Sequence, residues 1–168
     1  MSQVLILMGS DSDAPIMSAA GEVLTELGVT WEMTVASAHR SPARVMRLMH
    51  DAPGKGVRVF IVGAGAAAHL AGVVAAHTSQ PVIGVPIDSS ALKGLDALLS
   101  TVQMPPGVPV ATVAIGKPGA TNAGVLAAQM LALADEALAK RLAAYKRNLE
   151  EKVEAAARRL EMARAGSS

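Results

Sequence analysis

A histidine and an arginine stand side by side in a short polar stretch, Ser37-Ala38-His39-Arg40-Ser41-Pro42. An imidazole exchanges protons near neutral pH, and a guanidinium group suits a phosphate. Ser41 followed by Pro42 predicts an N-cap and a first helical residue. We therefore expect His39 and Arg40 on a loop at the carboxyl end of a strand, where open α/β sheets bind ligands.

A second polar stretch, Gly9-Ser10-Asp11-Ser12-Asp13, follows the first apolar run of the chain. Glycine permits a tight turn, and serine hydroxyls beside the free N–H groups of a helix start could cradle a phosphate. Ser10 and Ser12 would donate to the phosphate. Asp13 would accept from ribose hydroxyls, or it would only cap the helix. Asp11 is expected to be a turn residue.

A third stretch, Gly63-Ala64-Gly65-Ala66-Ala67-Ala68, fits the G-x-G-x-x-A pattern of dinucleotide-binding folds, with Asp88 near the distance of a ribose-binding acid. A flavin- or nicotinamide-binding protein is therefore one alternative. Small residues would also let a ligand ring approach the backbone closely. A receiver-like signalling domain fits poorly, because the third strand is expected to end at Gly63 without a phosphorylatable aspartate.

The remaining histidines give weaker signals. His69 lies in an apolar loop and is either a satisfied interior histidine or a direct participant. His50 is expected to be solvated, and His77 to end a helix. No histidine pair has a metal-site spacing, and nucleophile-elbow and P-loop motifs are absent, so we expect no metal. Residues 103–109 are rich in proline and could form a rigid wall of the site.

Alternating apolar and helical patterns must position these residues. Strands are predicted at residues 4–8, 31–36, 57–62, 81–85 and 110–115, and helices at residues 15–27, 42–52, 70–77, 92–101 and 120–133. This order predicts an α/β fold with a five-stranded parallel sheet between two helical layers. A flavodoxin-like three-layer sandwich suits it, for which 2-1-3-4-5 is the common strand order.

The end of the chain differs in composition from the rest. Residues 135–164 are charged and helical, with one apolar stripe formed by Leu138, Leu142, Tyr145, Leu149, Val153 and Leu160. We expect a catalytic domain at residues 1–134 and a C-terminal helical extension at 135–164 that packs on a neighbouring subunit. Only 17% of all residues are charged, against roughly 25% on average, which also indicates surface buried between identical subunits.

Composition excludes several classes of partner and chemistry. The chain has no cysteine, so disulfides and thiolate metal sites are excluded. A net charge of +1, with one Trp, one Tyr and one Phe, argues against a nucleic-acid partner. Residues 59–76 carry no charge, but glycines and a histidine interrupt them, so we expect no membrane span. No signal peptide is evident, and a cytoplasmic location is expected.

Four motifs, in this order and spacing, resemble the class I N5-carboxyaminoimidazole ribonucleotide mutases of purine biosynthesis. They are Met8-Gly9-Ser10-Asp11-Ser12-Asp13, Ser37-Ala38-His39-Arg40-Ser41-Pro42, Gly63-Ala64-Gly65 with Ala67-Ala68-His69-Leu70, and Val102-Gln103-Met104-Pro105. The match looks collinear over residues 4–133. The related class II enzymes carboxylate aminoimidazole ribonucleotide with free carbon dioxide and typically have lysine at the position of Arg40. A class II-like carboxylase is the rival enzyme.

The resemblance implies an octamer of flavodoxin-like subunits that needs no metal or organic cofactor. It implies a ribonucleotide substrate whose carboxylate moves from the exocyclic nitrogen to a ring carbon, and a functional link to the ATP-dependent synthetase that makes this substrate. His39 is implied as the proton carrier, with phosphate at Ser10, Ser12 and Arg40 and ribose at Asp13. The other implied substrate contacts are Gly9, Ser37, Gly65, Ala66, Ala67, His69 and Leu70.

The chain departs from the family pattern at two positions. The family usually has Gly-Gly-Ala-Ala-His-Leu-Pro-Gly where this chain has Gly65-Ala66-Ala67-Ala68-His69-Leu70-Ala71-Gly72. The methyl group of Ala66 could crowd the ring or oppose a positive φ, and the lack of proline at Ala71 could loosen the loop. Neither change touches His39, but turnover could suffer.

Overall fold

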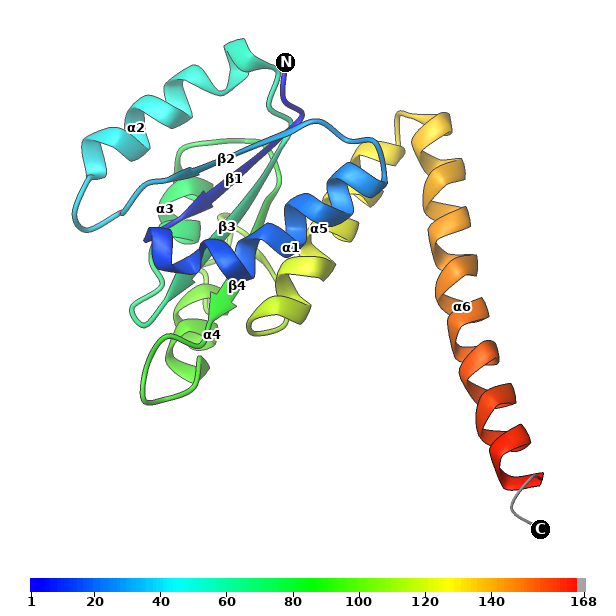
Figure 1. Ribbon diagram of the computed structural model, residues 1–168. Helices are drawn as coiled ribbons and strands as arrows, with labels where there is room; N and C mark the ends of the chain where they lie inside the picture. Colours follow the sequence, from blue (N-terminus) through cyan, green and yellow to red (C-terminus); the bar gives the residue numbers. More distant parts are fainter. Residues whose placement is uncertain (166–168) are drawn as a thin grey trace.

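The computed structural model describes residues 1–165 and contains one parallel five-stranded sheet with the order β2-β1-β3-β4-β5 (Figure 1). The predicted flavodoxin-like architecture and strand order are confirmed. The strands are β1 (Val4–Met8), β2 (Trp31–Val35), β3 (Val59–Gly65), β4 (Val82–Ile87) and β5 (Ala111–Thr112).

Helices cover both faces of the sheet. They are α1 (Ala14–Glu26), α2 (Pro42–Asp51), α3 (Leu70–Ala76), α4 (Leu95–Val102), α5 (Lys117–Ala132) and α6 (Glu136–Ala165), with short 3-10 turns η1 (Asp11–Asp13) and η2 (Pro53–Lys55). Along β1, Val4, Ile6 and Met8 pack in the core that includes α1 and α5, whereas Leu5 and Leu7 pack in the core that includes α2 and α3. Burial on both faces explains why this strand is apolar without alternation.

The third strand is longer than predicted. It was expected to stop at residue 62, but Gly63, Ala64 and Gly65 belong to β3, because β4 pairs with all three of them. A hydrogen-bonded ladder here outweighs the weak strand propensity of glycine. Gly63 has a packing reason as well, because a Cβ there would overlap the sulfur of Met17 from α1.

The fourth strand also runs past its predicted end at residue 85. It continues to Ile87 and so includes Pro86. The carbonyl of Pro86 accepts a hydrogen bond from the N–H of Gly116, 2.8 Å away, so this residue faces the side of β5. On that side β5 pairs only with Ile83 and Gly84 and has already ended. A proline therefore removes no ladder hydrogen bond at this position.

Three other boundaries differ from expectation. The last strand has two residues rather than the expected six, since the chain turns away after it to begin α5 at Lys117. Helix α5 therefore starts earlier than residue 120. Helix α4 starts later than residue 92, because Lys93 and Gly94 adopt φ values of 51° and 84°.

Helix α6 has two environments along its length. Near its start, Leu138 is buried and Leu142 and Tyr145 pack against the core that includes α5. Arg141 Nε donates a 2.7 Å hydrogen bond to the carbonyl of Leu27, at the C-terminus of α1. Farther along, Val153 is 68% exposed, and the helix projects away from the sheet (Figure 1).

No helix in the described part of the chain is long and apolar enough to span a membrane. The uncharged stretch at residues 59–76 forms β3, a loop and α3 instead.

Candidate active site

A pocket opens at the carboxyl ends of β1, β2, β3 and β4, where the loops that follow these strands meet. In the sheet, β2 lies on one side of β1 and β3 lies on the other, so the direction of the strand order reverses at β1. The carboxyl end of β1 is therefore the topological switch point of the sheet. Two backbone hydrogen bonds join the strand ends there. Gly9 N–H donates to the carbonyl of Gly63 at 3.3 Å, and Ala36 N–H donates to Met8 at 2.9 Å.

Every predicted site residue except Ala66 lines this pocket. Ala64, from the small-residue stretch expected to approach a ligand ring, also lines it, whereas the lining residues Ala38 and Ser89 were missed by the sequence analysis. Ser89 lies two residues beyond the end of β4, as Ser10 does beyond β1 and Ser37 beyond β2. A serine two residues after a strand would have identified Ser89 as a candidate if β4 had been predicted to end at Ile87.

The loop after β2 is closed by two serines. Ser41 occupies the N-cap position of α2, but its hydroxyl does not cap the helix. It accepts from Ser37 N–H at 3.0 Å and donates to the Ser37 carbonyl at 3.2 Å. The hydroxyl of Ser37 in turn accepts from Arg40 N–H at 3.1 Å. The predicted N-cap position of Ser41 and first helical position of Pro42 are therefore confirmed. The Ser41 hydroxyl makes no capping bond, and instead it shapes the turn that presents His39 and Arg40.

Arg40 connects the loops after β2 and β1. Its Nη2 donates to the carbonyl of Gly9 at 3.0 Å, and the side chain is otherwise exposed to the pocket. A guanidinium group has five N–H donors, so one bond to Gly9 leaves donors for an anion. This contact fixes the positive charge beside the loop Gly9–Asp13.

The serines of the loop after β1 already bond each other. Ser12 Oγ donates to Ser10 Oγ at 2.9 Å, and Ser12 N–H donates to the same oxygen at 3.3 Å. Ser10 Oγ donates to Asp11 at 3.2 Å, so Asp11 supports the turn as expected. An anion bound here would exchange these contacts for charge-assisted ones, which are roughly twice as strong.

Asp13 is buried, although it also lines the pocket. It stands at the N-cap position of α1 without a side-chain capping hydrogen bond, so the capping interpretation is wrong. Burial raises the pKa of this carboxyl group, while a hydrogen bond from the Ser10 backbone and the charge of Arg40 partly oppose the rise. A carboxylate held in this way gains from new donors such as ribose hydroxyls.

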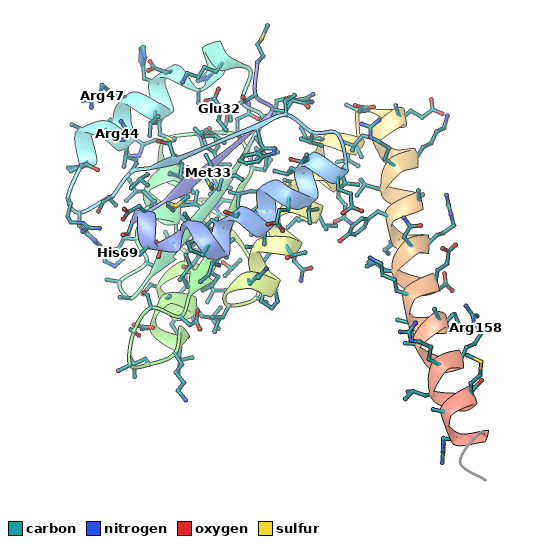
Figure 2. The ribbon with its side chains drawn as sticks, in the orientation of Figure 1. Glu32, Met33, Arg44, Arg47, His69 and Arg158 are labelled. Atoms are coloured by element: carbon teal, nitrogen blue, oxygen red, sulfur yellow. The ribbon has the colours of Figure 1, made fainter. Side chains whose placement is uncertain are left out.

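The rings of His39 and His69 meet in the pocket. His39 Nε2 and His69 Nδ1 are 2.8 Å apart, and the rings pack edge to face at 73° with centroids 4.9 Å apart. Figure 2 shows His69 at the end of the sheet where α1 begins. The interior interpretation of His69 is wrong, because its side chain is exposed and faces another titratable ring. One nitrogen must donate and the other accept, so the contact links the tautomers of the two rings.

The loop that carries His69 contains a strained residue. Ala66 has a φ of 51°, in the left-handed region that favours glycine. Two tight hydrogen bonds follow, from Ala68 N–H to Ala66 at 2.9 Å and from His69 N–H to Ala67 at 2.8 Å. Alanine therefore adopts the positive φ that its methyl group opposes, and the bend brings Ala67 and His69 into the pocket.

The other candidates lie away from the pocket. His50 is exposed and contacts Asp51 at 3.1 Å, whereas His77 bonds the carbonyl of Val73 at 2.8 Å at the end of α3. The proline-rich residues 103–109 do not line the pocket within one chain, contrary to the wall predicted there. In residues 1–165, no cluster of three or more histidine, aspartate or glutamate side chains is placed to hold a metal ion.

Comparison with known proteins finds relatives that match most of this chain. The family model for AIR carboxylase matches residues 3–152. The chain is 50% identical over 161 residues to the N5-carboxyaminoimidazole ribonucleotide mutase of Thermotoga maritima, covering 96% of this chain and 93% of that protein. It is 53% identical over 148 residues to the enzyme of the same name from Bacillus subtilis, covering 88% and 91%.

A solved structure gives the same result for the fold. The crystal structure of Treponema denticola PurE superposes with a TM-score of 0.81 at 27% sequence identity. The match covers 89% of this chain and 92% of that chain.

Asp13→Asn is expected to raise the melting temperature at neutral pH. Because burial raises the folded-state pKa of Asp13, the native protein loses stability as pH rises through that value. The amide carries no charge, so the gain should be present at pH 7 to 8 and fade as the pH falls to about 4. Thermal unfolding across this pH range measures it, with exposed Asp11→Asn as the control. A lower melting temperature at pH 7 would contradict the assignment.

Ala66→Gly is expected to stabilise the fold by about 1 kcal/mol, because a non-glycine residue in the left-handed region costs roughly 1–2 kcal/mol. Chemical denaturation measures the change. Ala67→Gly is the matched control, since Ala67 has an ordinary φ and the substitution there should destabilise. Equal effects of the two substitutions would show that Ala66 is not strained.

Proposed function

The chain belongs to the AIR carboxylase family, and from that premise we propose that it converts N5-carboxyaminoimidazole ribonucleotide to 4-carboxy-5-aminoimidazole ribonucleotide, an isomerisation in purine biosynthesis. The observation that carries the proposal is the meeting of three chemically different groups in one pocket. A serine and arginine cradle suits phosphate, a histidine pair suits proton transfer, and a wall of small residues suits a planar ring.

The phosphate of the substrate would lie on the loops after β1 and β2. Ser10, Ser12 and Arg40 supply hydroxyl and guanidinium donors there, and the fixed contact between Arg40 and Gly9 keeps the charge in place. Asp13 would accept from the ribose hydroxyls, which would add to the hydrogen bonds that its carboxylate already accepts from Ser10 and Ser12. These groups would fix one end of the substrate and leave the chemistry to the other end.

His39 would act first as an acid and then as a base. The bond between the exocyclic nitrogen and its carboxylate breaks, carbon dioxide is released, and His39 gives a proton to that nitrogen. The ring carbon then bonds to the carbon dioxide. His39, now neutral, takes the proton from that ring carbon and restores the aromatic ring, so the catalyst ends in its starting state.

His69 would orient this proton carrier. Its Nδ1 lies 2.8 Å from His39 Nε2, the distance of a hydrogen bond, and it can hold the His39 ring in one position and tautomer. Ser37, Gly9, Gly65, Ala67 and Leu70 would surround the imidazole and the migrating carboxylate. These residues would keep the released carbon dioxide beside the ring. Two reactants held in a suitable geometry can react as if one were present at an effective concentration of roughly 10⁵ M or more.

The substrate carries a carboxylate on nitrogen, which an ATP-dependent carboxylation must install. We therefore propose a functional link to the synthetase that performs it. The cytoplasmic location stays a prediction.

We also propose that residues 1–134 form the catalytic domain and that residues 135–164 extend onto a neighbouring subunit of an octamer. The first turns of α6 pack on their own chain, but Leu149, Val153 and Leu160 farther along are 45%, 68% and 69% exposed. Apolar residues repeated on one exposed side of a helix indicate a surface that another protein chain covers.

The activity is tested by supplying each carboxylation state separately. The wild-type protein should consume the N5-carboxylated ribonucleotide without added bicarbonate, and should consume aminoimidazole ribonucleotide poorly even when bicarbonate is added. The reverse preference would favour the class II-like carboxylase.

His39→Asn should lower turnover of the N5-carboxylated substrate by about 10²-fold or more, since a general acid–base group contributes about 10²–10⁴-fold. The affinity for the ribonucleotide should change little, because the phosphate contacts remain. His77→Asn, which alters a histidine outside the pocket, is the matched control and should keep its activity. Substantial turnover by a folded His39→Asn protein would remove His39 from this role.

Val153→Glu should lower the molar mass of the assembly in analytical ultracentrifugation, because a charge would be buried in the proposed subunit contact. Lys152→Glu, on the neighbouring exposed position, is the control and should leave the assembly unchanged. An unchanged molar mass for Val153→Glu, or a monomeric wild-type protein, would contradict the proposed packing.

A further inference from the structure

Ser89 is a pocket residue with no part in the chemistry described so far. It follows β4, whose carboxyl end lies beside that of β3 in the sheet. Adjacent strands are about 4.8 Å apart, so two strand spacings, or roughly 10 Å, separate the end of β4 from the end of β1. Ser89 therefore lies on the side of the pocket remote from the serines of the loop after β1.

The backbone of β3 makes room for this hydroxyl. A Cβ added at Gly65 would overlap Ser89 Oγ and would lie 3.2 Å from the carbonyl of Ile87. Gly65 does not have a positive φ, so conformational freedom is not why glycine stands there. The missing side chain at Gly65 lets the Ser89 hydroxyl lie directly over the end of β3, at the wall of the pocket.

The Ser89 hydroxyl differs from its neighbours in its hydrogen bonding. Ser90 Oγ accepts from Leu92 N–H at 3.1 Å and so belongs to the turn before α4. Ser89 Oγ has no such bond within residues 1–164. Besides His69, whose ring faces His39, the end of β3 and the loop after it line the pocket with Ala64, Gly65, Ala67 and Leu70, none of which has a polar side chain. Ser89 is thus the hydroxyl on a wall whose other polar side chain, His69, already contacts His39.

We propose that the Ser89 hydroxyl donates a hydrogen bond to the carboxylate of the substrate and thereby selects the carboxylated over the uncarboxylated ribonucleotide. This inference rests on the proposed function, which places the phosphate at the loops after β1 and β2 and the imidazole toward β3 and β4. A carboxylate on that ring needs donors when it leaves water. Carbon dioxide is neutral, so the apolar part of the same wall can hold it once the carboxylate is released.

The test is a comparison of two binding constants in the full-length protein. Calorimetry with 4-carboxy-5-aminoimidazole ribonucleotide and with aminoimidazole ribonucleotide gives the selectivity of each variant. Ser89→Ala should weaken binding of the carboxylated compound about 10-fold or more, as expected for a hydrogen bond to a charged group. Binding of the uncarboxylated compound should change less than about twofold, because it lacks the accepting carboxylate.

Ser90→Ala is the matched control. It removes a hydroxyl from the same loop that bonds the backbone, so it should leave the selectivity unchanged even if the melting temperature falls. Equal weakening of both ligands by Ser89→Ala, or no weakening of either, would overturn the proposal. If Ser89→Ala retains the wild-type selectivity while the wild type turns over the N5-carboxylated substrate, the role of Ser89 fails and the function stands. If the wild type does not turn over that substrate, the proposed function fails first.

Discussion

The hydrogen bond between His39 and His69 joins two loops whose residues are 30 positions apart in the sequence. The bond can form because β1 pairs in parallel with both β2 and β3. The segments that follow β2 and β3 therefore leave the sheet at the same end, beside each other across β1. Each ring then restricts the tautomer and orientation of the other, since one nitrogen of the contact must donate and the other accept. The serines of the loop after β1, Arg40 and the small residues at the end of β3 all line the pocket that holds this histidine pair. Their roles in the proposed reaction depend on that position.

The site also concentrates features that the fold alone would not favour. Asp13 is a buried carboxyl group, and Ala66 holds a backbone conformation that suits glycine. Arg40 is held over Gly9 by a hydrogen bond, beside serines that bond one another. Strained backbone and buried polar groups persist where the surrounding structure fixes them, and they cluster at functional sites. Here the buried sheet, packed on both faces, supplies that rigidity.

Much of this arrangement could be predicted from the sequence, because apolar runs and polar loops alternate along the chain. The runs predicted the parallel sheet, and the polar loops that follow β1 and β2 predicted most of the pocket. The errors arose where pairing between distant strands outweighs local preference. Glycines at the end of β3 and Pro86 in β4 resemble loop residues, but the ladder holds them in strands. Ser89 was missed for this reason. His69 was predicted as a substrate contact through the resemblance, but sequence patterns do not show that a second histidine faces it.

The most direct test of the account is a crystal structure of the protein with 4-carboxy-5-aminoimidazole ribonucleotide bound. The account predicts the phosphate against Ser10, Ser12 and Arg40, with the His39 ring within hydrogen-bonding reach of the imidazole or its carboxylate. A ribonucleotide whose phosphate lies elsewhere, or whose ring is remote from His39, would contradict it.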